Sequence, residues 1–248
     1  MNTESPRRLA VFSDIHGNIH AFDAVLAAID ALEIRALVCC GDVVGYGAFP
    51  NECCERLRER NIPTLAGNHD HAALGMTDIR FFNDIAKAAV HWTAEHLSVE
   101  NAAWLRECPY IYEIPPEFIF VHASPNNPEQ WGYVLTFGDA RLSFMRFKHR
   151  FCFIGHSHQP AIVEQDDNDL TSPEGLELAI RPDCRYLVNA GSVGQPRDHN
   201  PDACFVTVDL DEEVIAFHRV PYDVDAARDA IENNGLPFEL GERLVYGW

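Results

Sequence analysis

The sequence predicts an α/β fold of the four-layer αββα sandwich type, in which two β-sheets pack face to face between outer layers of helices. Two patterns predict it. Residues 9–66 alternate short apolar runs with amphipathic segments, as parallel strands joined by helices do. Residues 110–220 carry one strand-like apolar run after another. We therefore expect a single domain over residues 1–248, with a core of about 7–220 and a C-terminal helical extension of about 223–248.

The first elements follow from the spacing of apolar residues. Residues 9–12 form an apolar run that predicts a strand, and residues 20–34 place apolar side chains at helical spacing. Residues 36–40 predict the next strand, and residues 50–61 predict a helix opened by its proline. Residues 63–70 predict a third short strand that runs into a polar loop. These elements together predict a parallel sheet with helices packed on it.

The later elements change in character after about residue 110. Residues 82–106 and 139–147 look helical, residues 166–174 read as a polar hairpin loop, and a C-terminal helix over 223–233 ends at Gly235. Strand candidates are residues 110–114, 117–123, 151–158, 160–164, 176–180, 185–192, 204–210 and 213–220. A parallel half followed by a strand-rich half predicts two sheets packed together with helices outside.

Charge restricts the partners of this chain. It has 19 Lys and Arg residues against 38 Asp and Glu residues, a formal net charge of −19. Such a surface repels polyanions, so we expect no long nucleic acid as a partner, although a local cluster of cations can still accept a small phosphate ester. No apolar run approaches the roughly 18 residues of a membrane helix, and residues 1–14 do not resemble a signal peptide. We expect a cytoplasmic protein without a membrane partner, and the oligomeric state stays open.

Polar clusters follow several of the predicted strands. They are Asp14-Ile15-His16, Gly41-Asp42, Gly67-Asn68-His69-Asp70, His122 and Gly155-His156-Ser157-His158. Because ligands of α/β sheets bind beyond the carboxyl ends of strands, we expect these clusters to meet at one edge. Carboxylate, amide and imidazole ligands without thiolate suit Mn, Fe(II) or Zn. Seven ligands exceed what one tetrahedral ion uses, whereas two ions sharing a carboxylate would employ them all.

These clusters resemble, in order, the five motifs of the calcineurin-like metallophosphoesterases. The motifs are DIHGN at 14–18, GDVVGYG at 41–47, GNHD at 67–70, VHA at 121–123 and GHSH at 155–158. NAGSVGQPRD at 189–198 further resembles the bacterial and archaeal phosphodiesterase branch of that family. The resemblance implies an αββα sandwich with two mixed sheets. It also implies hydrolysis of a phosphate ester with two divalent metal ions, manganese first, with iron, zinc or nickel as alternatives.

The resemblance implies a set of ligands for each metal ion. The ligands of the first ion would be Asp14, His16 and His158. The ligands of the second ion would be Asn68, His122 and His156. Asp42 would bridge the two ions.

The resemblance also implies the chemistry of the site. A hydroxide bridging the two metals would attack the phosphorus, and His69 would face the phosphate as the catalytic residue that protonates the departing oxygen. No acidic residue that would orient His69 is evident in the sequence. Candidates for contacts with the substrate are Asn18, Tyr46, Ser192 and Arg197.

The sequence departs from the protein phosphatases of this family at one motif. Their GDxxDRG supplies an arginine that clamps phosphate and an aspartate, and both are missing from GDVVGYG at 41–47. We therefore expect the substrate to be a small phosphate mono- or diester, or a nucleotide-like molecule, rather than a phosphoprotein. Two alternatives stay open: a pyrophosphohydrolase of the diadenosine-polyphosphate type, and a metal-binding regulatory protein without turnover.

Overall fold

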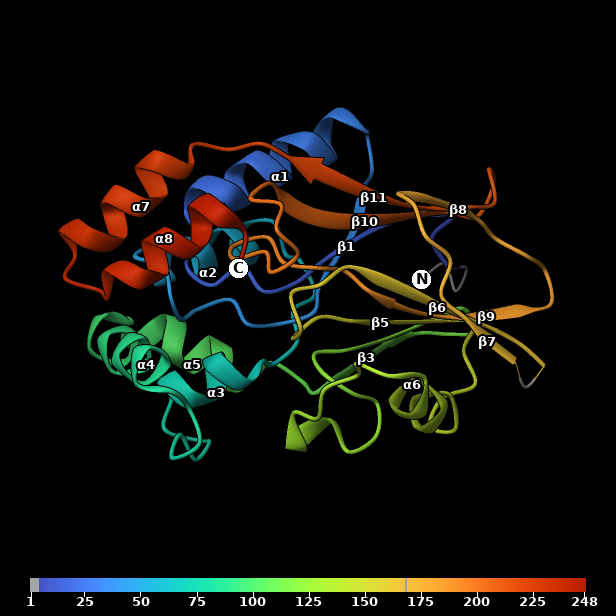
Figure 1. Ribbon diagram of the computed structural model, residues 1–248, viewed down its shortest axis with the longest axis horizontal. Coiled ribbons are helices and arrows are strands. Elements are labelled where there is room, and N and C mark those ends of the chain that lie inside the picture. The colour runs from blue at the N-terminus through green and yellow to red at the C-terminus, as the bar shows by residue number, and fades with distance from the viewer. Residues whose placement is uncertain (1–4, 168) are drawn as a thin grey trace.

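Two mixed β-sheets lie face to face in the computed structural model, which describes residues 5–167 and 169–248 (Figure 1). The expectations for residues 1–4 lie outside the described part of the chain. The first sheet has the strand order β2-β1-β10-β11-β8. Its strands are β1 (Arg8–Phe12), β2 (Ala36–Cys39), β8 (Glu177–Ala179), β10 (Ala203–Asp209) and β11 (Val214–Val220). Among its described strands, β1 and β2 pair in parallel and the other pairs are antiparallel. The sheet combines strands from the N-terminal and C-terminal parts of the sequence.

The second sheet has the strand order β3-β4-β5-β9-β6-β7. Its strands are β3 (Ile111–Ile114), β4 (Phe118–Val121), β5 (Phe151–Ile154), β6 (Ala161–Asp166), β7 (Asp169–Thr171) and β9 (Cys184–Asn189). β4, β5 and β9 run parallel to one another at its centre, and the remaining pairs are antiparallel. The predicted fold class, an α/β sandwich of two mixed sheets, is confirmed.

The helices cover the outer faces and one end of the sandwich (Figure 1). They are α1 (Ile19–Ala31), α2 (Pro50–Glu59), α3 (Asn68–Ala73), α4 (Asp84–His96), α5 (Val99–Arg106), α6 (Phe137–Phe144), α7 (Val224–Asn233) and α8 (Phe238–Tyr246), with a short 3-10 helix at Pro128–Gln130. α1 and α2 pack on the first sheet, and α6 packs on the second. α4, α7 and α8 share a separate apolar cluster at the end of the molecule. No helix among the described residues is both long enough and apolar enough to cross a membrane.

Strand alternation divides the core into layers. Ala10 and Phe12 of β1 face the helical layer around α1, whereas Leu9 and Val11 face the phenylalanines of the second sheet. The interior between the sheets is rich in stacked rings, such as Phe120 and Phe153 with centroids 5.5 Å apart. This packed double sheet is the base from which the loops at its edge project.

The short strand expected at the start of residues 63–70 is reduced to a single parallel bridge, and the polar loop expected after it is wrong. Only Thr64 bridges to Cys39, and the polar residues after Gly67 form helix α3 instead of a loop. The carboxylate of Asp70 accepts a hydrogen bond from the backbone N–H of Gly67 at 3.0 Å. This side chain satisfies a donor at the start of the helix, so the chain coils immediately after the bridge.

One other local expectation is confirmed in more detail, and one needs correction. Residues 82–106 are helical as expected, in two helices, because the hydroxyl of Ser98 accepts from the backbone N–H of Asn101 and starts α5 afresh. The polar loop expected at 166–174 contains strand β7, since Leu170 packs on the apolar cluster under α6 while its neighbours pair with β6. Residue 168 of that loop lies outside the described residues.

Candidate active site

The polar motifs lie in the loops that follow β1, β2, β4 and β5, and in the first turn of α3. Backbone hydrogen bonds join these loops. Asp14 N donates to Gly41 O at 3.0 Å, and Gly155 N donates to His122 O at 2.8 Å. Across the two sheets, His156 N donates to Asp14 Oδ2 at 2.9 Å. The motifs therefore meet at the carboxyl ends of parallel strands, where α/β sheets bind ligands.

The structure brings the predicted metal ligands together in two groups. Within each group, one ligand atom from every residue lies within 4.8 Å of the others. The first group is Asp14, His16 and His158. The second group is Asp42, His122 and His156. Asn68 lies beside the second group, with its Oδ1 atom 3.1 Å from Nε2 of His122. All seven side chains are buried, none being more than 7% exposed.

Asp42 lies between the two groups. Its Oδ2 atom is 3.3 Å from Nε2 of His122 and 3.6 Å from Nε2 of His16. Its other oxygen accepts a hydrogen bond from the backbone N–H of His69 at 2.8 Å, which fixes the carboxylate. One oxygen that reaches both groups is the arrangement required of a ligand shared by two ions.

Three imidazoles are oriented by backbone carbonyls. The Nδ1 atoms of His16, His122 and His158 lie 3.1, 2.9 and 2.6 Å from the carbonyl oxygens of Val44, Cys40 and Gln195. A carbonyl only accepts, so each Nδ1 donates its hydrogen, which leaves Nε2 as the atom of each ring that can ligate a cation. The Nε2 atoms of His16 and His158 then face each other at 3.1 Å, with no donor between them. Such facing lone pairs, with Nδ1 held by a carbonyl, are typical of imidazoles that ligate a cation.

Unpartnered polar atoms mark the same positions. Asp14 Oδ1, Asp42 Oδ2 and His156 Nε2 are buried and have no hydrogen-bond partner among the described residues. Burying a carboxylate oxygen without a partner is costly, and a cation would remove the cost. The donor set and its orphaned atoms therefore fit divalent metal ions.

The pKa shifts of the candidate ligands also indicate a site for cations. Burial alone would raise the pKa of Asp42, but the neighbouring His122 holds that pKa well below its ordinary value. Burial would lower the pKa of His122, and the charge of Asp42 overrides it and raises that pKa to about 9. The space between these side chains thus attracts positive charge.

Backbone strain is concentrated in the candidate ligands. The φ angles of Asp14, His16, Asp42, His156 and His158 are 56°, 50°, 51°, 68° and 60°, in the left-handed region. This conformation is uncommon outside glycine and costs about 1–2 kcal/mol per residue. The surrounding hydrogen bonds hold five such residues in one place, a pattern that points to a functional centre.

His69 lies next to the two groups, on α3. Its ring packs between Tyr46 and Phe82, with centroid distances of 4.4 and 5.2 Å, and its Nδ1 has no hydrogen-bond partner among the described residues. Burial lowers the pKa of His69 to about 4. The neighbouring Asp70 does not orient this ring, because its two oxygens accept from the backbone N–H groups of Val44 and Gly67.

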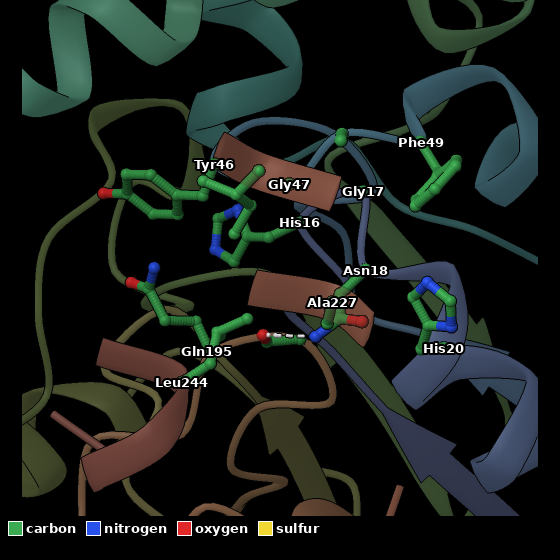
Figure 2. A pocket seen from close by; sticks show the side chains of 13 residues that line it. His16, Gly17, Asn18, His20, Tyr46, Gly47, Phe49, Gln195, Ala227 and Leu244 are labelled. Atoms are coloured by element: carbon green, nitrogen blue, oxygen red, sulfur yellow. Dashed lines mark hydrogen bonds between the residues drawn. The ribbon is translucent and has the colours of Figure 1, made fainter. Parts of the chain in front are cut away.

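The four candidates for substrate contact fall into two kinds. Asn18 and Ser192 bind backbone: Asn18 caps α1 and donates to Gly194 O at 3.0 Å (Figure 2), and Ser192 donates to Asp14 O at 2.8 Å. The space beside Asn18 is a cavity of only about 10 Å³, which is too small for an ester. Tyr46 and Arg197 instead line a larger cavity of about 410 Å³, together with Asn68 and His69. Contact with a substrate stays a prediction for all four.

Several side chains of that larger cavity were not singled out from the sequence. They are Phe81 and Phe82 before α4, Tyr133 in the loop before α6, and Arg243 and Trp248 from α8 and the residues after it. Tyr133 stacks on the ring of His156 with a centroid distance of 4.0 Å. Phe81, Phe82, Tyr133 and Trp248 lie outside the motifs given above, so only the spacing of aromatic residues could have drawn attention to them.

The comparisons with known proteins agree over nearly the whole chain. A family model of the calcineurin-like phosphoesterase superfamily domain matches residues 8–213. The uncharacterized protein MJ0912 of Methanocaldococcus jannaschii is 39% identical over 250 residues, covering 96% of this chain and 98% of that protein. A crystal structure of a metallophosphoesterase from Sphaerobacter thermophilus has 34% identity and a TM-score of 0.84, covering 97% of this chain and 99% of that one. The chain shares its fold with the hypothetical protein PH1004 of Pyrococcus horikoshii. That structure has 24% identity and a TM-score of 0.78, covering 97% of this chain and 98% of that one. The chain belongs to the calcineurin-like phosphoesterase superfamily.

Proposed function

We propose that this chain is a phosphoester hydrolase that uses two divalent metal ions on a small phosphate mono- or diester. The observation that carries the proposal is the position of Asp42, whose Oδ2 atom reaches both buried ligand groups. Asp14, His16 and His158 would hold one ion, and Asn68, His122 and His156 would hold the other. Membership of the phosphoesterase superfamily supports the reaction class.

Metal ions bound there would polarise phosphoryl oxygens and lower the pKa of a bound water molecule. The chain's own residues would do the rest. In hydrolysis, the oxygen of water forms a bond to phosphorus, the bond to the leaving oxygen breaks, and that oxygen takes up a proton. His69 borders the cavity beside the ligand groups, where it would face the phosphate. The negative charge of a bound phosphate would raise the pKa that burial lowers to about 4, so that the ring would carry this proton and supply it. Arg197 lines the same cavity and would bind a phosphoryl oxygen.

The metal preference follows from the ligands. Imidazoles make up four of the seven ligand side chains, Asp14 and Asp42 supply carboxylates, and Asn68 supplies an amide oxygen. Mn(II) accepts such a mixture, with iron, zinc and nickel as alternatives, whereas Mg(II) prefers oxygen alone. We propose Mn(II) as the most effective activator.

Metal reconstitution tests the function. The protein is stripped with a chelator, its metal content is measured, and each metal is restored separately. Hydrolysis of bis(p-nitrophenyl) phosphate, p-nitrophenyl phosphate and diadenosine tetraphosphate is then followed. We expect no turnover of the stripped protein and the largest recovery with Mn(II). Full activity at zero metal content would overturn the metal dependence, and metal binding without turnover of any ester would favour the regulatory alternative.

A further inference from the structure

The cavity beside the ligand groups extends well beyond the space for one phosphate. Its volume is about 410 Å³, within the range of about 300–1,000 Å³ common for small-molecule sites. One wall carries His69 and Asn68, at the candidate metal centre. Another part of the lining comes from α8 and the residues after it, through Arg243 and Trp248. The lining therefore joins a reaction centre to groups that have no place in the hydrolysis itself.

Two arginines of this cavity pair with no acidic residue that the structure describes. No carboxylate of the described residues pairs with Arg197 or Arg243, in a chain where acidic residues outnumber basic ones 38 to 19. Asp198 follows Arg197 directly, yet its carboxylate pairs with Arg219 instead. Arg197 binds neutral groups only, donating to Gln195 Oε1 at 3.1 Å and to Tyr46 OH at 3.5 Å. Both guanidinium groups thus remain available to an anion.

Large aromatic side chains are exposed at the same cavity. Phe81 is 91% exposed and Trp248 is 56% exposed, although each could bury a large apolar area. Both line the cavity. Exposed rings at a cavity with unpaired arginines favour a ligand that is partly planar and aromatic and partly anionic.

The end of α8 is held firmly against the loop that carries Arg197. The backbone N–H of His199 donates to Gly247 O at 2.8 Å, and the N–H groups of Gly247 and Trp248 donate to Arg243 O at 2.9 and 3.3 Å. Gly247 has a φ of +67°, and a Cβ atom there would lie 2.7 Å from backbone atoms of Asn200. Glycine suits both this turn and this close contact because it has no Cβ atom, and the turn places Trp248 at the cavity.

We propose that Arg243 and Trp248 form a specificity subsite for the non-reacting part of the substrate. This inference rests on the proposed function. Arg243 would bind a second anionic group, and Trp248 with Phe81 would contact a planar ring. The substrate class that combines these features with a scissile phosphate is a nucleotide with more than one phosphate, which the same site would cleave as a pyrophosphohydrolase. For a nucleoside diphosphate, the oxygen of water would bond to the terminal phosphorus, the P–O–P bond would break, and the nucleoside monophosphate would leave, its oxygen taking up a proton.

Substrate discrimination tests the subsite. Hydrolysis of ADP, AMP, inorganic pyrophosphate and p-nitrophenyl phosphate is measured in the Mn(II)-loaded protein. We expect ADP to have the highest kcat/KM of the four. Arg243→Gln and Trp248→Leu should each lower kcat/KM for ADP about 10- to 100-fold, mainly through KM, and lower it much less for p-nitrophenyl phosphate.

Matched variants separate the subsite from general damage. Arg106→Gln removes an exposed arginine of α5, and Phe238→Leu removes an exposed ring of α8 that does not line the cavity. Both should leave all four rates unchanged. Gly247→Ala should reproduce the loss with ADP, because it displaces Trp248 from the loop at His199.

Binding provides a readout that does not depend on turnover. Calorimetry of ADP with the protein, before metal is added, should give weaker binding for Arg243→Gln and Trp248→Leu than for wild type and the two controls. If the loaded protein hydrolyses no ester but ADP binding depends on Arg243 and Trp248, the proposed function fails and the subsite stands. If p-nitrophenyl phosphate is hydrolysed and neither variant changes the preference for ADP, the subsite fails and the function stands.

Discussion

Among single residues, Asp42 is the side chain on which both candidate metal positions depend. Its Oδ2 atom is near both ligand groups, and the backbone N–H of His69 fixes its other oxygen. Asp42→Asn keeps the shape but removes a negative charge where two cations would meet. We expect metal content and turnover to fall together, and metal analysis beside initial rates measures both. Loss of turnover with two metals still bound would contradict the bridging role.

His69 contacts the cavity without belonging to either ligand group. We expect His69→Asn to keep the metal content of wild type while slowing turnover about 10²- to 10⁴-fold, the usual effect of a general acid. The loss should be smaller for p-nitrophenyl esters than for alkyl esters, because p-nitrophenolate leaves without needing a proton. An equal loss with both kinds of ester would instead assign His69 to stabilising charge on the phosphate, and loss of a metal would make it a ligand.

The residues that the sequence predicts well are those in short motifs at strand ends. Asp14, His16, His156 and His158 lie at fixed offsets from buried strands, so the topology alone brings them together. Arg243 could not be predicted in this way. It reaches the cavity only because α8 packs against α4 and α7, a contact between segments far apart in the chain that leaves no local pattern.

At the level of elements, the start of α3 depends on one glycine. A Cβ atom on Gly67 would collide with the carboxylate and the backbone of Asp42. We expect Gly67→Ala to displace Asp42 or the first turn of α3, with loss of metal binding and a lower melting temperature. Calorimetric unfolding with and without Mn(II) measures both effects.

Gly138→Ala is the matched control for this glycine. Gly138 lies within α6, and the nearest atom to an added Cβ is Thr136 Oγ1, at 3.4 Å. An alanine in a helix is favoured over glycine, so this variant should keep metal binding and hold or raise stability by up to about 1 kcal/mol. Equal behaviour of the two variants would show that Gly67 is not required by the contact with Asp42.

Most elements could be predicted from apolar spacing, and the errors have local physical causes. Apolar periodicity does not predict helix α3, because the helix starts with a side-chain contact, in which the carboxylate of Asp70 accepts a hydrogen bond from the N–H of Gly67. The break before α5 depends on the hydroxyl of Ser98. Strand β7 depends on the packing of Leu170 against residues distant in sequence. In each case, one side-chain contact determines the local secondary structure against the pattern of apolar residues.

Across the whole molecule, charge separates the surface from the cavity. The formal net charge of −19 repels polyanions at a distance, whereas Arg197 and Arg243 act only within the cavity. An anion small enough to enter the cavity would be attracted by the two arginines. A long polyanion would first be repelled by the acidic surface. We therefore expect the site to admit a small anion more readily than a large one.

The salt dependence of hydrolysis tests this separation. We expect little cleavage of long duplex DNA at low ionic strength, and a kcat/KM that rises as salt is added, because salt screens repulsion over about 8–10 Å at physiological concentrations. Proteins that bind DNA through phosphate contacts show the opposite slope, with binding falling steeply as salt rises. For bis(p-nitrophenyl) phosphate, which carries one charge, kcat/KM should change little over the same range. Efficient cleavage of DNA that weakens with salt would show that a basic surface, and not the two arginines of the cavity, governs access to the site.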